Sequence, residues 1–182
     1  MNFIKTPFEG LIVCEPKVWG DERGYFYEAY NEKIFQEGGI ETKFVQDNQA
    51  FSSYGILRGL HYQVAPYTQA KLVRVLQGEV LDIVVDIREK SSTYGQHFAI
   101  MLSAANKRQL FIPRGFAHGY VVLSETAEFF YKCDNFYSKE SEGGLRYNDP
   151  QLNIDWQIGF EDIIVADRDA NFPDLGKHKK LL

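Results

Sequence analysis

The feature that most constrains this chain is a series of short β-type runs separated by Gly, Pro, Asn or Ser. This spacing is typical of an all-β sandwich or barrel, and not of alternating helices and strands. The aromatic share of 15% supports the same interpretation, because aromatic side chains favour pleated, half-buried strand surfaces. The predicted strands cover residues 11–15, 25–29, 44–50, 56–63, 71–76, 79–87, 98–102, 109–112, 119–123 and 128–133.

Helical signals are scarce. The best candidate begins after Asn31, whose side chain suits an N-cap, and ends at Gly38 and Gly39, which suit a helix C-terminus. A length of 182 residues falls within the range of one domain, and no segment has the composition of a linker. We therefore expect residues 1–182 to form a single all-β domain with a few short peripheral helices.

One turn and one strand pattern carry further expectations. Gln77–Gly78 separates two strand-like runs and predicts a hairpin, in which 71–76 and 79–87 are antiparallel neighbours. In the second run Asp82 and Asp86 alternate with aliphatic residues, so one face is apolar and the other carries carboxylates.

Charge and composition exclude several classes of protein. The net charge of −5 provides no basic field for nucleic acid or an anionic membrane. The N-terminus lacks the apolar stretch of a signal peptide, and no run is long enough to span a membrane. Cys14 and Cys133 are isolated, as expected for reduced, buried side chains. A soluble cytoplasmic protein is the expectation.

The segment Arg58–Gln63 places a cation, an imidazole and an amide in a predicted core strand. In a regular strand Arg58 and His61 would point to opposite faces, because side chains alternate. A bulge or kink at Gly59 would turn both to one face. The alternative is a structural histidine with a surface arginine.

The segment Pro113–Gly119 suggests a tight turn that leads His118 into the next strand. Its Pro-x-Gly-x-x-His pattern resembles the second motif of the cupin superfamily, which consists of small antiparallel jelly-roll barrels. Many cupins bind a metal through a His-x-His pair, but here Tyr62 and Gln63 follow His61. With His only at positions 61, 97, 118 and 178, three imidazoles are hard to assemble, although carboxylates could complete a site.

Further segments extend the resemblance to nearly the whole chain: Asp21–Phe26, Gln46–Asn48, Gln69–Arg74 and Arg168–Ala170. Together with the two motifs above, they resemble the dTDP-4-dehydrorhamnose 3,5-epimerase family. The resemblance implies epimerisation of a dTDP-linked 4-keto-6-deoxy sugar at the two carbons beside its ketone, without a cofactor, in the pathway to dTDP-L-rhamnose.

The resemblance also implies catalytic roles, which fit the chemistry. Removing a hydrogen beside a ketone requires a base and stabilisation of the enolate. His61 matches the base, and Asp169 matches the carboxylate that orients it. Lys71 matches a lysine near the ketone oxygen, with a structural ion pair to Asp82 as the alternative. Tyr131 matches the acid on the opposite face; from the strand pattern alone, it would be a packing residue.

The remaining implied residues contact the substrate. Arginines suit a diphosphate, because guanidinium groups bind phosphate oxygens in bidentate fashion. The family consists of homodimers in which the N-terminal region of one subunit, here around Arg23 and Phe26, completes the site of its partner. The substrate-binding residues are Arg23, Phe26, Glu28, Gln46, Asn48, Arg58, His118, Tyr137, Glu142 and Arg168, where Arg168 replaces a more common lysine and Glu28 and Glu142 have surface roles as alternatives.

Three other functions remain open from the sequence. The nearest is a relative that epimerises one carbon only or acts on a different nucleotide sugar. A second is a cupin that binds sugar nucleotides without catalysis, and a third is a metal-dependent cupin oxygenase.

Overall fold

The computed structural model describes residues 1–181 and consists mainly of strands. The two α-helices are short: α1 (Glu32–Glu37) and α2 (Asp167–Ala170), and there are two single-turn 3₁₀ helices, Lys139–Ser141 and Phe160–Asp162. The strands are β1 (Asn2–Lys5), β2 (Ile12–Glu15), β3 (Trp19–Asp21), β4 (Gly24–Phe26), β5 (Gln46–Ser53), β6 (Ile56–Gln63), β7 (Lys71–Gln77), β8 (Glu79–Asp86), β9 (His97–Ser103), β10 (Gln109–Ile112), β11 (Phe116–Val122), β12 (Thr126–Cys133), β13 (Glu142–Gly144) and β14 (Ile164–Val165).

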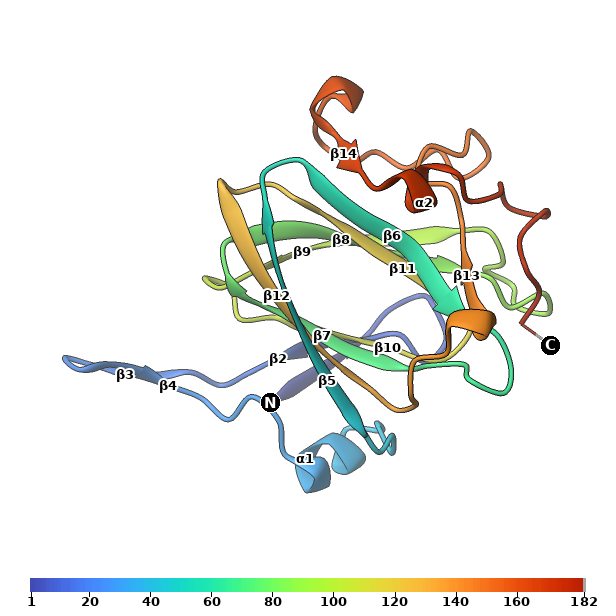
Figure 1. Cartoon of the computed structure of the whole chain (residues 1–182). Coiled ribbons are helices and arrows are strands. Elements are labelled where there is room, and N and C mark those ends of the chain that lie inside the picture. Colours follow the sequence, from blue (N-terminus) through green and yellow to red (C-terminus); the bar gives the residue numbers. More distant parts are fainter. Residues whose placement is uncertain (182) are drawn as a thin grey trace.

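Two antiparallel sheets face each other and enclose a central space (Figure 1). One has the order β1-β2-β10-β7-β12-β5, and the other β13-β6-β11-β8-β9, with β14 added in parallel to β6. Apart from β1–β2 and β8–β9, the neighbouring strands in these two sheets are not consecutive in the sequence, as in a jelly roll. The predicted all-β barrel is confirmed.

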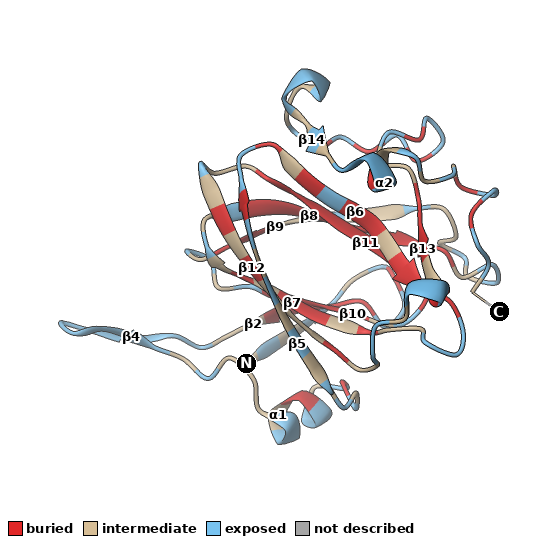
Figure 2. Cartoon of the chain, in the orientation of Figure 1, coloured by how far each residue is buried: buried red, intermediate tan, exposed pale blue. Residues whose placement is uncertain are grey.

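The alternation in β8 explains how the second sheet is buried on both faces. Val80 and Val84 lie in the core between the sheets, together with Val73 and Phe129 from the opposite sheet. Leu81, Ile83 and Val85 point the other way, against Trp156 and other side chains of the C-terminal segment. Figure 2 shows the resulting run of buried residues along β8 and β11. A sheet covered on both faces gives the site a rigid wall.

The prediction that Gln77–Gly78 closes a hairpin between 71–76 and 79–87 is wrong. β7 pairs with β10 and β12, whereas β8 pairs with β9 and β11, so the turn carries the chain from one sheet to the other. The turn is held by other loops: Ala104 N donates to Gly78 O at 3.0 Å, and Glu79 N donates to Ser124 Oγ at 2.8 Å. A tight turn with a left-handed glycine, here at φ 76°, therefore marks a change of sheet.

The helix after Asn31 is confirmed, since the Asn31 side chain accepts hydrogen bonds from Lys33 N and Ile34 N. The segment predicted as strand 25–29 is shorter: β4 pairs only with β3, and this hairpin extends away from the barrel (Figure 1). β1, β3, β13 and β14 were not predicted. Among residues 1–181 no helix is long and apolar enough to cross a membrane.

Candidate active site

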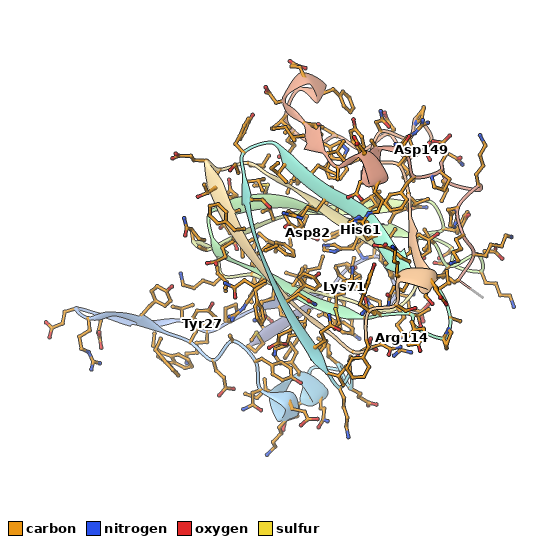
Figure 3. The ribbon with its side chains drawn as sticks, in the orientation of Figure 1. Tyr27, His61, Lys71, Asp82, Arg114 and Asp149 are labelled. Carbon is orange, nitrogen blue, oxygen red and sulfur yellow. The ribbon has the colours of Figure 1, made fainter. Side chains whose placement is uncertain are left out.

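A cavity of about 580 Å³ opens between the two sheets. Figure 3 shows His61, Lys71 and Asp82 between the two sheets, while Tyr27, Arg114 and Asp149 lie outside. The predicted site residues that line the cavity are Gln46, Asn48, Arg58, His61, Lys71, His118, Tyr131, Tyr137, Glu142, Arg168 and Asp169. Their strands belong to both sheets, so the cavity has two chemically distinct walls.

An irregularity in β6 brings Arg58 and His61 to the same cavity, as expected. β6 pairs with β11 as His118↔His61 and Tyr120↔Arg58, so the register shifts across Gly59. Gly59 has φ 141°, and a Cβ there would lie 2.5 Å from Gly119 Cα. The close contact of two glycines on neighbouring strands is therefore what allows the turn of β6.

His61 forms the predicted pair with Asp169. Its Nε2 lies 2.9 Å from Asp169 Oδ2, which also accepts a hydrogen bond from Gly59 N at 3.1 Å. Burial alone raises the pKa of Asp169, but the His61 ring, Arg168 and the Gly59 amide outweigh it, and the net pKa is lower than usual. Asp169 is therefore a carboxylate that can orient and stabilise a charged imidazole.

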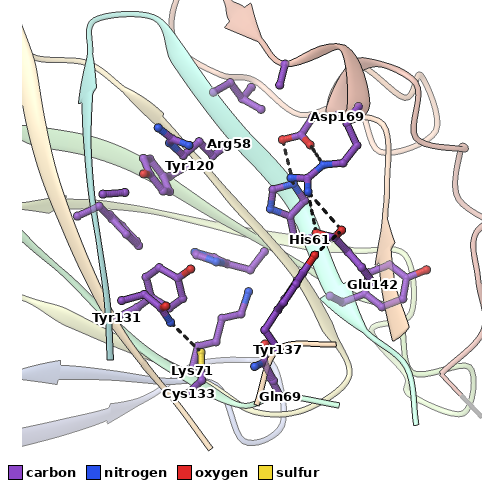
Figure 4. A pocket seen from close by; sticks show the side chains of 18 of the residues that line it. Arg58, His61, Gln69, Lys71, Tyr120, Tyr131, Cys133, Tyr137, Glu142 and Asp169 are labelled. Carbon is purple, nitrogen blue, oxygen red and sulfur yellow. Dashed lines mark hydrogen bonds and ion pairs between the residues drawn. The ribbon is translucent and has the colours of Figure 1, made fainter. Parts of the chain in front are cut away.

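Tyr131 stands on the opposite wall. It belongs to β12 of the other sheet, and its pKa is raised to about 12 by burial. Lys71 Nζ lies 5.9 Å from the centre of the Tyr131 ring (Figure 4). Burial lowers the pKa of Lys71, with Cys133 and Asp82 acting in the opposite direction. A protonated phenol and an ammonium thus share one wall, across the cavity from His61.

The ion pair between Lys71 and Asp82 considered from the sequence is not formed in the described structure. Asp82 lies in β8 and bonds to His118, with Oδ2 2.9 Å from His118 Nε2. Both side chains are buried, and Asp82 Oδ1 is one of the buried atoms without a hydrogen-bond partner. Burial raises the pKa of Asp82 and lowers that of His118, so the pair favours its neutral form.

Three polar residues form a network at the rim of the cavity (Figure 4). Arg168 Nη1 donates to both Glu142 oxygens at 3.0 and 3.2 Å, and Tyr137 Oη donates to Glu142 Oε2 at 3.2 Å. Gln63 holds the loop of Tyr137, because Ser138 N donates to Gln63 Oε1 at 2.6 Å. This network connects the exposed Tyr137 ring with the His61–Asp169 pair.

Three predicted residues lie away from this cavity. Arg23 and Phe26 are on the β3–β4 hairpin, and Glu28 follows it; all three are exposed. Arg23 bonds to Asp21 of the same hairpin. Their roles toward a partner subunit stay a prediction.

The cavity also contains residues that sequence reasoning missed. The Tyr120 hydroxyl is buried without a hydrogen-bond partner in the described chain, and its ring stacks on Phe129 with centroids 4.0 Å apart. Cys133 is a buried free cysteine, whose Sγ accepts a hydrogen bond from Asn48 at 3.8 Å. Both residues lie in strands whose sequence has the hydrophobic pattern of a core strand. Tyr120 lies two residues after His118 and therefore on the same face of β11, which is the one signal of its inward orientation.

Metal ligands do not cluster in the part of the chain that the structure covers. Residues 1–181 contain no group of three or more His, Cys, Asp or Glu side chains able to hold an ion. The cavity places a His–carboxylate pair on one wall and a phenol and a lysine on the other, which is suited to acid–base chemistry.

A jelly-roll barrel with a His–carboxylate pair and a phenol on opposite walls of its cavity defines a cupin-type protein suited to acid–base chemistry. The sequence model of the dTDP-4-dehydrorhamnose 3,5-epimerase family matches residues 5–177. The chain is also 52% identical to the dTDP-4-dehydrorhamnose 3,5-epimerase of Shigella flexneri, over 94% of each chain. It belongs to this family, and the expectation from sequence is confirmed.

Solved structures agree with this assignment. A 3,5-epimerase from Legionella pneumophila, in complex with dTDP-4-keto-L-rhamnose, superposes with a TM-score of 0.91 at 51% identity, covering 95% of this chain and 92% of that one. A more distant 3'-monoepimerase from Streptomyces bikiniensis, in complex with dTDP-quinovose, gives 0.87 at 30% identity, covering 93% and 85%. The fold is therefore shared by enzymes that differ in the number of carbons inverted.

Proposed function

We propose that this protein inverts dTDP-4-dehydro-6-deoxy-D-glucose at C3 and C5 to give dTDP-4-dehydro-L-rhamnose. The observation that carries the proposal is the placement of His61 and Tyr131 on opposite sheets around one cavity. Each inversion removes a proton from one face of the sugar ring and returns a proton to the other. An acid and a base on facing walls meet that requirement.

His61 acts as the base in this proposal. A neutral imidazole has one ring nitrogen with a lone pair, which can accept the weakly acidic hydrogen beside the ketone. The carboxylate of Asp169, 2.9 Å away, stabilises the imidazolium that forms. The C4 ketone of the sugar supplies the electron sink for this step, so the proposal requires no resident cofactor.

Lys71 and Tyr131 complete the reaction. The Lys71 ammonium stabilises the enolate oxygen as the proton leaves, an interaction that gains strength in a buried site. Tyr131 then donates its phenolic proton to the carbon from the opposite face. Its pKa of about 12 keeps the phenol protonated, as an acid must be before it acts.

The rim residues suit the nucleotide. Arg58 and Arg168 line the cavity and supply cations that suit the diphosphate, and the exposed Tyr137 ring offers a face on which the thymine base stacks. Gln46, Asn48, His118 and Glu142 would contact the substrate with their polar groups.

We further propose a homodimer in which the β3–β4 hairpin completes the site of the partner subunit. The hairpin leaves the barrel, and Trp19, Tyr25 and Phe26 on it are between 51% and 70% exposed. Such aromatic exposure is typical of an interface. We also infer that residues 1–182 form one domain and that the enzyme works in the cytoplasm, where its two free cysteines stay reduced.

Incubation with dTDP-4-keto-6-deoxyglucose in deuterated water, followed by NMR, tests the proposal. Deuterium at both C3 and C5 of the inverted sugar is the expected result. Deuterium at C3 alone would replace the proposal with the single-carbon activity of the Streptomyces relative. No incorporation at either carbon, with the nucleotide sugar still bound, would leave a binding protein.

A further inference from the structure

The side-chain amide of Gln63 joins two loops beside the cavity. Its Nε2 donates to Tyr67 O at 2.6 Å and to Phe136 O at 3.1 Å, and its Oε1 accepts a hydrogen bond from Ser138 N at 2.6 Å. A glutamine amide has two N–H donors and one oxygen, and here all three are used. The residue is only 5% exposed, so bulk water competes little for these bonds. Gln63 is therefore a fixed link between the two loops.

Two of these three bonds lie on either side of Tyr137. The carbonyl of Phe136 precedes it in the chain, and the amide of Ser138 follows it. Gln63 thus holds the backbone that carries the Tyr137 ring. Tyr137 is 55% exposed, and its hydroxyl donates to Glu142 Oε2 at 3.2 Å (Figure 4). Because packing covers less than half of this residue, the position of its ring depends on the hydrogen bonds to its loop and to its hydroxyl.

The strand that carries Gln63 also carries the proposed catalytic base. His61 and Gln63 are two residues apart in β6, so their side chains leave the strand on the same face, and both line the cavity. β6 holds His61 directly, and through the amide of Gln63 it also holds the loop of Tyr137. One strand, paired on both sides by β11 and β13, therefore sets the separation of these two side chains.

We propose that Gln63 is a positioning residue, which keeps the Tyr137 ring in place to stack on the nucleobase at a fixed separation from His61. The inference rests on the proposed function, in which Tyr137 receives thymine. A loop that is ordered before binding loses little conformational freedom when the ligand arrives, so the affinity is higher. Gln63 needs no contact with the substrate for this role.

Gln63→Met tests the inference through nucleotide binding. Methionine is unbranched and as long as glutamine but lacks the amide, so most of the packing is kept. We expect the Kd of dTDP to rise about tenfold, because the loop must then be ordered on binding. The Kd of inorganic pyrophosphate, which has no ring to stack, should change less than about twofold. Calorimetry with both ligands measures this difference. An unchanged Kd of dTDP, or an equal change for pyrophosphate, overturns the inference.

A double-mutant cycle tests whether Gln63 acts through Tyr137. Tyr137→Ala has no ring to position, so adding Gln63→Met to it should weaken dTDP binding by less than about a further twofold. Additive losses would contradict the inference, because Gln63 would then influence the nucleotide by another route.

Two further variants control for effects on folding. Asp149→Leu removes another buried side chain that holds a loop: Asp149 accepts a hydrogen bond from Leu175 N at 2.7 Å and lies outside the cavity. Its dTDP affinity should equal that of the wild type, and a matching loss would assign the effect of Gln63→Met to general destabilisation. If Gln63→Met does not fold, Gln63→Glu replaces it. The carboxylate keeps the shape but offers no donor to the two carbonyls, so the same difference between dTDP and pyrophosphate is expected.

Hydrogen exchange in the free enzyme separates this inference from the proposed function. The Ser138 amide donates to Gln63, so it should exchange at least about tenfold faster in Gln63→Met than in the wild type. Unchanged exchange overturns the inference even where the enzyme inverts both carbons. If the wild type does not bind dTDP, the proposed function is wrong and the stacking role of Tyr137 fails with it, whatever the exchange rate of Ser138.

Discussion

Lys71 combines burial with charge at the place where the enolate oxygen would form. Burial lowers its pKa below the ordinary 10.5, whereas burial raises the pKa of Tyr131 to about 12. As the pH rises, Lys71 therefore loses its proton first, at a pH below 10.5, and Tyr131 remains an acid throughout that range.

We predict an alkaline loss of activity that belongs to Lys71. In Lys71→Met the rate should fall about 10²- to 10³-fold, the cost of losing one preorganised electrostatic group, and the alkaline limb should disappear. Lys71→Arg keeps the charge and should shift the limb to higher pH. A rate profile from neutral to strongly alkaline pH checks this, and an unchanged limb in Lys71→Met would assign it to another group.

Site residues could be predicted from the sequence where a polar side chain occurs in an otherwise apolar strand. His61 and Arg58 are conspicuous in β6, and Gly59 between them indicated the irregularity that brings both to the cavity. Tyr131 gives no such signal, because Glu128–Cys133 has the pattern of a core strand. Its candidacy came from the family resemblance, as did that of Asp169, which is distant in sequence.

At the scale of elements, the bend of β6 depends on the contact between Gly59 and Gly119. We predict that Gly59→Ala destabilises the fold by about 2–4 kcal/mol, the sum of backbone strain at positive φ and of overpacking. The new Cβ would meet Gly119 Cα at 2.5 Å. Urea denaturation gives the free energy of unfolding.

Gly176→Ala is the control for this prediction. Gly176 also has a positive φ, 86°, but no atom lies within 4 Å of an added Cβ, so strain acts alone. Its effect should be smaller by at least about 1 kcal/mol. Equal losses in the two variants would show that the close contact of the strands contributes nothing.

The strand positions could be predicted from the sequence, but their pairing could not. Alternation and turn residues are local, so β6 and β10 have the predicted bounds. Pairing is not local, because it depends on which distant strands pack against one another. In β8, Val80 and Val84 lie on one face, and Leu81 and Ile83 lie on the other. Both apolar faces of β8 are buried, one against the opposite sheet and one against the C-terminal segment. This burial requires β8 to pair with β9 and β11 in the second sheet and not with β7 in the first.

At the scale of the whole molecule, the β3–β4 hairpin extends from the barrel with its aromatic side chains exposed. If it completes the partner's site, Arg23 and His61 act in the same site but come from different subunits. Arg23→Ala and His61→Ala should each be inactive. Mixed dimers of the two would contain one site with both lesions and one intact site.

We predict that co-refolding the two variants in equal amounts restores about a quarter of wild-type activity, because half of the dimers are mixed and each has one intact site. The activity is measured with the same nucleotide sugar. Mixing without unfolding is the control, since stable dimers do not exchange. No gain after co-refolding would mean that each chain builds its own site.

The central claim is that protons leave the sugar on the His61 side and return on the Tyr131 side. Tyr131→Phe in deuterated water tests it most directly, by comparing deuterium incorporation with inversion at the same carbon. We predict that incorporation persists while inversion falls at least about 10²-fold, the contribution of one acid. His61→Ala should lose both. Equal loss of incorporation and inversion in Tyr131→Phe would contradict the account.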